Sequence, residues 1–270
     1  MSMRTVRQPA VAGRFYPGSA TELSREVDRL LGAARAASAP PAGQLRALLV
    51  PHAGYRYSGP TAACGYALAE AERERFTRVL LLGPAHFVGF PGLAVPGVEA
   101  FATPLGEVAL DTATLERLCD LPQVTRSDAV HAPEHSLEVQ LPFLQRTLGT
   151  VTLVPVAVGD ASADDVAAVV DACWSPDTLL LVSSDLSHYL PYAQARATDA
   201  DTLRRVLARE GPLPEHRACG VRAVDGLLLA VRQRGLHPSL IDARNSGDTA
   251  GDPSRVVGYA AVSFTEEATR

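Results

Sequence analysis

Short apolar runs alternate with stretches of helical periodicity along most of the chain. Runs typical of strands buried on both faces of a sheet lie at 45–50, 78–83, 151–158 and 178–184. Apolar residues spaced three or four positions apart, typical of helices, occur over 19–37, 60–75, 111–120, 136–148, 162–174, 192–210 and 217–234. The segments LHPSLID and 255–264 have the character of closing strands. This alternation predicts an α/β fold with a mainly parallel central sheet flanked by helices on both faces.

Proline and small residues interrupt the alternation at two places. The sequence SAPPAG at 38–43 predicts a loop after the first helix. Pro142 lies inside the periodic segment 136–148 and is expected to perturb the helix there. No internal repeat or low-complexity tract divides the chain, so we predict a single domain over residues 1–270.

The composition is that of a globular protein and excludes several classes of function. Apolar residues make up 47% of the chain, charged residues 20%, and the net charge is −5, which does not favour nucleic acid as a partner. All 25 basic residues are arginines, so chemistry that needs a Schiff-base or P-loop lysine is excluded. No run has the length or apolarity of a membrane span or a signal peptide, and a cytoplasmic protein without a membrane partner is expected.

Polar side chains follow three of the predicted strands. His52 follows the strand 45–50, His86 follows 78–83, and Asp185 and His188 follow 178–184. Because ligands bind beyond the carboxyl ends of the strands in open α/β sheets, these residues are expected to share one pocket if the strands are neighbours. The alternatives are a buried, hydrogen-bonded histidine at each position and, for Asp185, a helix cap with His188 in the first turn.

Further candidates lie outside these strand ends. Tyr55, in the loop after His52, and Glu134 and His135, before a predicted helix, are candidates to line the pocket, although Glu134 is also typical of a helix start. Cys219 lies near a predicted helix start, where a thiol pKa is lowered, but from the residue alone a small buried side chain is the favoured alternative. The four cysteines are widely spaced and predict free thiols. His131 and His237 are expected at the surface or in loops, without a role.

These residue types are suited to a metal site. Two neutral imidazoles and one anionic ligand leave coordination positions open for substrate, as in non-haem iron(II) enzymes. Zinc and copper also accept histidine and cysteine. A remaining histidine can act as an acid or base near neutral pH, and a neighbouring carboxylate can orient its ring.

Six blocks of the sequence, in order, resemble the Memo family. They are PHAGYRYSG, GPAHF, EHSLEVQLPFL, SSDLSHYLPY, ACG at 218–220 and NSGDTAGDPSRVVGYAA, with AGRFYPGS at 12–19 matching the N-terminal motif of the family. The resemblance covers residues from about 9 to 264. The bacterial form of the family is called AmmeMemoRadiSam system protein B, which implies a functional association with AMMECR1-like and radical-SAM proteins.

The resemblance implies a fold and a set of site residues. The family is similar in fold to class III extradiol dioxygenases, and by that similarity His52, His86 and Cys219 would be metal ligands. Asp185 and His188 would lie beside the metal as catalytic residues, with His135 lining the pocket. Cysteine stands where the dioxygenases use a carboxylate, so their ring-cleaving reaction does not follow from the fold alone. The stretch after Cys219–Gly220 departs from the family pattern and makes Arg222 a candidate anion contact.

Three functions are compatible with these residues. The first is a metal-dependent oxidoreductase of dioxygenase-like ancestry, with iron as the expected metal and copper or zinc as alternatives. In it, His188 would act as acid or base, with Asp185 orienting its ring. The second is a non-catalytic module whose pocket binds a small molecule or a peptide. The third is a metal-assisted hydrolase, because similar ligand sets also activate water.

Overall fold

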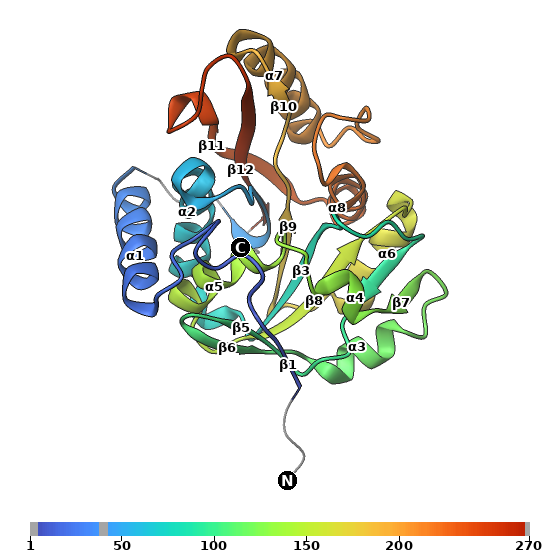
Figure 1. Ribbon diagram of the computed structural model, residues 1–270. Coiled ribbons are helices and arrows are strands. Elements are labelled where there is room, and N and C mark those ends of the chain that lie inside the picture. The colour runs from blue at the N-terminus through green and yellow to red at the C-terminus, as the bar shows by residue number, and fades with distance from the viewer. Residues whose placement is uncertain (1–4, 38–42, 268–270) are drawn as a thin grey trace.

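A large mixed sheet forms the middle of the molecule (Figure 1). The computed structural model describes residues 5–37 and 43–267. Along the sheet the strands run in the order β10 (His188–Leu190), β12 (Val256–Glu266), β2 (Gln44–Val50), β9 (Thr178–Ser183), β3 (Arg78–Pro84), β8 (Thr152–Val158), β4 (Leu93–Val95) and β7 (Val124–Arg126). A further strand, β11 (His237–Asn245), pairs with β12.

The direction of the strands differs between the centre and the two sides of this sheet. The central strands β2, β9, β3 and β8 are all parallel, as the apolar runs predicted. On one side β12 is antiparallel to β2, and on the other β4 is antiparallel to β8. The parallel centre is buried on both faces, which explains why its strands show continuous apolar runs rather than alternation.

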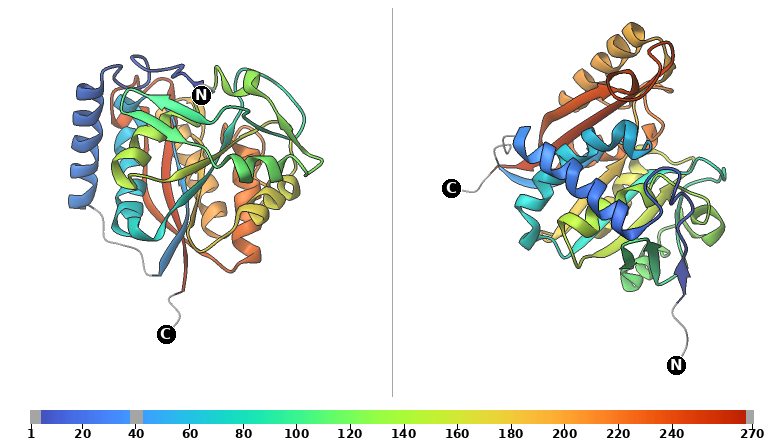
Figure 2. Two further views of the ribbon diagram at one scale, coloured as in Figure 1. Left: turned by 90° about the horizontal axis from the view of Figure 1, so that it is seen from below. Right: turned by 60° about the vertical axis from the view of Figure 1, so that its left-hand side comes forward.

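Helices cover both faces of the sheet (Figure 2). They are α1 (Ala20–Ala37), α2 (Tyr55–Ala71), α3 (Thr112–Leu118), α4 (Asp128–His131), α5 (Leu141–Thr147), α6 (Ala163–Cys173), α7 (Tyr192–Leu207) and α8 (Val221–Gln233), with 3-10 turns at η1 (Arg73–Arg75), η2 (Glu138–Gln140) and η3 (Ser246–Asp248). Helices α1 and α5 pack on α2, while α6 packs on α8. None of the helices in the described ranges is long and apolar enough to cross a membrane.

Several short elements had no counterpart among the predicted ones. A separate three-stranded sheet combines β1 (Val6–Arg7), β5 (Ala100–Thr103) and β6 (Gly106–Ala109). The strands β4, β7 and β10 and the helix α4 are also only three or four residues long. Segments this short carry too few residues to show a period. The predicted loop at 38–43 falls almost wholly outside the described residues.

Pro142 divides the predicted helix 136–148, as expected. The segment forms the 3-10 turn η2 and then α5, which begins at Leu141 and places Pro142 in its first turn. A proline is tolerated there because the first backbone N–H groups of a helix have no partner within the helix.

A buried ion pair anchors the N-terminal segment to the chain around residue 138. Arg7 Nη1 donates to Glu138 Oε2 at 2.7 Å, and both side chains are almost completely buried. The Arg7 guanidinium also donates to the carbonyl groups of His131, Ala132 and Glu134. The Glu138 carboxylate accepts from the backbone N–H groups of Ala10 and Val11 and from the Tyr16 hydroxyl. Sequence analysis did not identify this pair.

The prediction that His131 lies at the surface is wrong. His131 ends α4 with its side chain buried, and its Nε2 donates to the Ala94 carbonyl at 2.9 Å. Burial is the main cause that lowers the pKa of His131; the hydrogen bond to Ala94 opposes it, the nearby Arg7 guanidinium adds to it, and the resulting pKa is about 4. The ring is therefore neutral in the folded protein at pH 7.

We expect His131 to make the protein less stable at mildly acidic pH. Between pH 6.5 and about 4 the unfolded chain takes up a proton on this ring and the folded protein does not. The free energy of unfolding therefore falls as the pH falls through this window, by up to about 3 kcal/mol from this residue. His131→Gln keeps an amide donor for Ala94 and removes the titration. Urea unfolding at a series of pH values should give a flatter curve for this variant, whereas parallel curves would contradict the assignment.

Candidate metal centre

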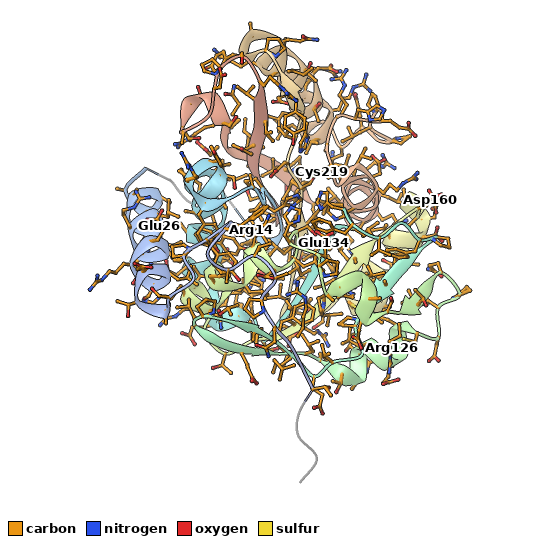
Figure 3. All side chains as sticks on the ribbon, in the orientation of Figure 1. Arg14, Glu26, Arg126, Glu134, Asp160 and Cys219 are labelled. Carbon is orange, nitrogen blue, oxygen red and sulfur yellow. The ribbon has the colours of Figure 1, made fainter. Side chains whose placement is uncertain are left out.

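The carboxyl ends of β2, β9 and β3 lie side by side and bring the predicted site residues together. These strands are consecutive in the sheet, so the condition set by the sequence analysis is met. His52 lies two residues beyond β2, His86 two beyond β3, and Asp185 two beyond β9. Cys219 enters from the segment before α8, and Figure 3 labels it, like Glu134, in the middle of the view.

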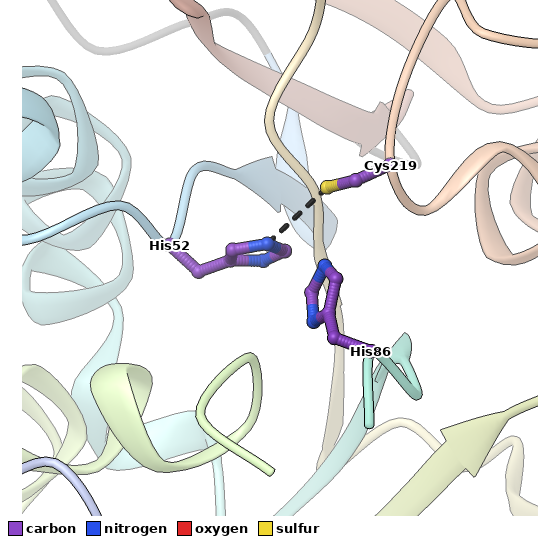
Figure 4. A group of neighbouring side chains, drawn as sticks. All are labelled: His52, His86 and Cys219. Carbon is purple, nitrogen blue, oxygen red and sulfur yellow. Dashed lines mark hydrogen bonds between the residues drawn. The ribbon is translucent and has the colours of Figure 1, made fainter. Parts of the chain in front are cut away.

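Two imidazoles and a thiol converge at this point (Figure 4). One potential ligand atom from each of His52, His86 and Cys219 lies within 4.8 Å of the other two. His52 Nε2 is 3.2 Å from Cys219 Sγ. The outer ring nitrogen of His86 points toward the gap between His52 and Cys219 (Figure 4). Residues that are far apart in the chain thus form one compact donor set.

The hydrogen bonds of Ser183 determine which nitrogen of His52 carries the proton. Ser183 Oγ donates to the Ser136 carbonyl at 2.6 Å and accepts from Gln140 Nε2 at 2.8 Å. His52 Nδ1 is 2.9 Å from the same oxygen, whose one hydrogen is already used, so Nδ1–H is the donor. The lone pair of His52 is therefore on Nε2, the nitrogen that faces Cys219.

Glu134 determines the tautomer of His86 in the same way. His86 Nδ1 lies 2.9 Å from Glu134 Oε1, and the His86 backbone N–H donates to Oε2 at 2.5 Å. Burial alone would raise the pKa of Glu134, but the contacts with His86 and Ser136 lower it to about 2. The ionised carboxylate accepts a hydrogen bond from the Nδ1–H of His86, so the lone pair of this ring lies on the outer nitrogen, Nε2.

Cys219 is held by backbone groups around Asp185. The Asp185 N–H donates to Sγ at 3.3 Å, and the Cys219 N–H donates to the Asp185 carbonyl at 3.2 Å. Helix α8 begins two residues later, yet its N-terminus does not lower the pKa of the thiol, which was one of the two alternatives for this residue. Burial, and secondarily the nearby Asp185, raise the pKa of Cys219 to about 12. Without a bound cation the residue is therefore a thiol.

Asp185 does not orient His188, contrary to the sequence-based expectation. Its Oδ1 accepts from the backbone N–H groups of His52 at 2.7 Å and Ala53 at 3.3 Å, so it holds the loop that carries His52. Burial raises the pKa of Asp185 to about 7, although these hydrogen bonds oppose the shift. The alternative of a helix capped by Asp185, with His188 in its first turn, is not observed either, because His188 begins the short strand β10.

Two further histidines line the cavity next to the three converging side chains. Burial lowers the pKa of His188, and it lowers that of His135 to about 4, so both rings are neutral at pH 7. The His135 ring stacks on His86, with centroids 4.6 Å apart, and also contacts Phe15. His135 and His188 are therefore placed to accept or supply a proton inside the cavity.

Tyr55 and Glu134 do not line the cavity as expected. The Tyr55 hydroxyl is buried and donates to the Val139 carbonyl at 2.7 Å, whereas its neighbour Tyr57 lines the cavity. Glu134 lies behind His86 rather than in the wall. Arg222 does line the cavity, but it pairs with Asp160 at 2.7 Å, so the expected role as a free anion contact is not supported.

The cavity that contains these residues has a volume of about 1350 Å³. The three converging side chains and Asp185 lie in its wall, together with His135 and His188. Tyr189, Glu215, Asp252 and Arg255 belong to the same wall. The volume exceeds the roughly 300–1,000 Å³ of ordinary small-molecule pockets, so a ligand larger than a single ring fits.

A second set of potential ligands overlaps the first. His86, Glu134 and His135 also lie close enough to hold a metal ion. However, Glu134 Oε1 already accepts from His86 Nδ1 and from the Ser136 N–H at 2.8 Å, and Oε2 accepts from the His86 N–H. The set of His52, His86 and Cys219 fits a metal better, because both of its imidazoles keep a free lone pair.

Sequence analysis missed the residues that fix the His52 ring. Ser183 ends β9, and Gln140 comes from η2; both are fully buried. Gln140 is itself held by the Tyr66 hydroxyl, which donates to Oε1 at 2.8 Å. The available signal was the pair of serines that ends an apolar strand; Gln140 lies among several other polar residues of the segment 136–148 and gave none.

Removing the Ser183 hydroxyl is expected to weaken metal binding without removing a ligand. Ser183→Ala leaves the His52 Nδ1–H without its acceptor, so the ring is free to turn and to change tautomer. Loss of such a partner lowers metal affinity by about 10- to 100-fold. Competition with a chromophoric chelator measures this change. Ser263→Ala, which removes a buried hydroxyl that has no hydrogen-bond partner within residues 5–37 and 43–267, is the matched control and should leave the affinity unchanged. Equal affinities for Ser183→Ala and wild type would contradict the orienting role.

The chain is similar in sequence to proteins of one family over almost its whole length. The family model described as Memo-like protein matches residues 7–263. A MEMO1 family protein of Aquifex aeolicus is 36% identical over 273 residues, covering 96% of this chain and 99% of the relative. A MEMO1 family protein of Sulfolobus acidocaldarius is 33% identical over 282 residues, with 96% and 99% coverage.

Among solved structures, an uncharacterized protein of Escherichia coli K12 has a similar fold. It superposes with a TM-score of 0.55 at 15% identity and covers 82% of this chain and 99% of its own. At this identity the likeness concerns the fold alone.

Proposed function

The chain belongs to the Memo-like protein family, and we propose that it binds one transition-metal ion through His52, His86 and Cys219 for use in oxidation–reduction chemistry. The observation that supports the proposal is the tautomer of the His52 and His86 rings. Each donates its Nδ1–H to a buried acceptor, which leaves two Nε2 lone pairs directed toward one thiol. This arrangement is characteristic of metal-binding histidines, whose other nitrogen is held by an outer partner.

The donor set limits which metal fits. Two imidazoles with one sulfur suit iron(II), copper(I) and zinc, whereas magnesium and calcium require oxygen ligands. A bound cation would also favour the thiolate form of Cys219, which burial otherwise disfavours. We propose iron(II) as the native metal, with copper and zinc as the alternatives. When bound, iron or copper would supply a site for electron transfer to or from a substrate, which zinc would not.

The surrounding residues supply proton transfer and positioning. His188 and His135 are neutral at pH 7 because burial lowers the pKa of each ring, so each can accept a proton from a substrate hydroxyl in the cavity. Asp185 holds the backbone of the His52 loop, and Glu134 holds the His86 ring. The direct partners of the reacting groups are therefore His188 and His135, while the two acids position the metal ligands.

The test is metal analysis combined with a redox assay. The protein is purified without oxygen, and separate samples are loaded with iron(II), copper(I) or zinc. Mass spectrometry of the metal content should then find about one ion per chain in the sample that received the native metal. Oxygen uptake with a panel of phenolic substrates should then occur with the redox-active metal and not with zinc. Metal binding without uptake, together with ligand binding that survives His188→Ala, would instead identify a non-catalytic binding module. Hydrolysis supported by zinc would identify a hydrolase.

A further inference from the structure

The rim of the cavity carries an arginine that has no acidic partner among the described residues. Arg255 precedes β12, is exposed, and lines the cavity. Its guanidinium lies over the ring of Tyr189, with Cζ 5.0 Å from the ring centroid. A guanidinium held on an aromatic face keeps its edge N–H groups free for a planar anion. Arg255 is thus placed to receive a ligand rather than to stabilise the fold.

The backbone at Tyr189 is strained in a way that presents its side chain at this rim. His188 pairs with Val257 and Leu190 with Val256, so Tyr189 is an extra residue in β10, a β-bulge. Its φ is 59°, which is unfavourable for a tyrosine, and its side chain remains 62% exposed. Bulges and strained backbone of this kind are concentrated next to functional sites, where they redirect a side chain.

The other charged groups of the cavity wall indicate which anion fits. Arg222 is already paired with Asp160, so its charge is compensated. Besides Asp185, three carboxylates line the same cavity: Glu215, Asp225 and Asp252. Asp225 accepts from the Leu213 N–H, and Asp252 accepts from the Ser254 N–H. These acids repel a dianion such as a phosphate ester more strongly than a singly charged carboxylate, so a carboxylate suits Arg255 better.

We propose that Arg255 and Tyr189 form a subsite for the carboxylate of an acidic substrate whose other end reaches the metal centre. The inference rests on the proposed function for the identity of that other end, because the subsite and the three metal ligands line one cavity. The volume of about 1350 Å³ leaves room for a molecule that spans both. His188, next in the chain to Tyr189, lines the same cavity and is placed to act on the bound molecule.

The test compares ligands that differ only in the charged end. Zinc-loaded protein is titrated calorimetrically with 3-(3,4-dihydroxyphenyl)propionate and with the corresponding amide, whose phenol groups offer the same metal ligands. Wild-type protein should bind the carboxylate about tenfold more tightly than the amide, as expected for a charge-assisted hydrogen bond. Arg255→Gln should weaken binding of the carboxylate probe but not of the amide, so that the ratio of their affinities falls close to one. Arg255→Lys should keep part of the preference for the carboxylate.

Arg222→Gln is the matched control, because it removes a second arginine of the same wall that is already ion-paired. This variant should leave the ratio unchanged. Equal ratios in wild type and Arg255→Gln, or no binding of either probe, would overturn the subsite. A phosphonate analogue that binds more tightly than the carboxylate through Arg255 would overturn the choice of anion.

Metal content of the same samples separates this inference from the proposed function. If the metal content is normal and the affinity ratio of carboxylate to amide does not depend on Arg255, only the subsite is contradicted. Protein that binds no metal sinks the proposed function. In that case the ratio for 3-(4-hydroxyphenyl)propionate and its amide, measured without metal, still decides the subsite: dependence on Arg255 supports it, and independence overturns it.

Discussion

Replacing either His52 or Cys219 is expected to abolish stoichiometric metal binding. His52→Ala removes one of the two free Nε2 lone pairs, and Cys219→Ser replaces a soft sulfur donor by a hydroxyl that is a poor ligand. Loss of a direct ligand should lower the affinity by more than the roughly 10- to 100-fold that follows loss of an outer partner. Metal analysis after gel filtration, and competition with a chelator, measure the effect in both variants.

A thermal shift gives an independent measurement of the same prediction. A metal that binds only the folded protein stabilises it by about 3 kcal/mol when present at 100 times its dissociation constant. Wild type should therefore melt at a higher temperature after metal is added, whereas the two variants should show no such shift. Cys119→Ser, which alters a half-buried thiol outside the cavity, is the control and should behave like wild type. Retention of one ion per chain by both variants would refute the site.

The convergence of His52, His86 and Asp185 could be predicted because each of them follows the carboxyl end of a strand. A buried parallel strand is recognisable as an apolar run, and the polar residues that follow it must lie at one edge of the sheet. His52, His86 and Asp185 were identified in this way. Whether their strands are neighbours is decided by pairing between distant segments, which no local pattern records. The order β2, β9, β3 supplied that information.

The roles of individual polar residues were less predictable than their positions. Asp185 and His188 lie three residues apart, which suggested an acid that orients an imidazole. The chain is extended there rather than helical, and the Asp185 carboxylate turns to the backbone of the His52 loop instead. A carboxylate accepts equally well from a ring or from a backbone N–H, so spacing alone does not select its partner. The same limit explains why Ser183 and Gln140 were overlooked.

The negative charge of Glu138 is expected to contribute more to the free energy of unfolding than any other polar group of this region. Glu138→Gln removes the charge that balances the buried Arg7 guanidinium and places an amide among groups that all donate hydrogen bonds. Removing one partner of a buried ion pair typically lowers the free energy of unfolding by about 3–5 kcal/mol. Glu138→Asp keeps the charge on a shorter side chain, so its effect should lie between those of wild type and Glu138→Gln. Urea unfolding of the metal-free protein measures both.

Asp28→Asn is the matched control, because it removes the acidic partner from an exposed pair with Arg146. Exposed ion pairs contribute only about 0–1 kcal/mol, so this variant should unfold close to wild type. A loss in Glu138→Gln no greater than that in Asp28→Asn would show that the buried pair does not anchor the N-terminal segment. The Arg7 guanidinium also binds the carbonyl of Glu134, the residue that holds the His86 ring. Glu138→Gln should therefore weaken metal binding as well as stability, whereas Asp28→Asn should change neither.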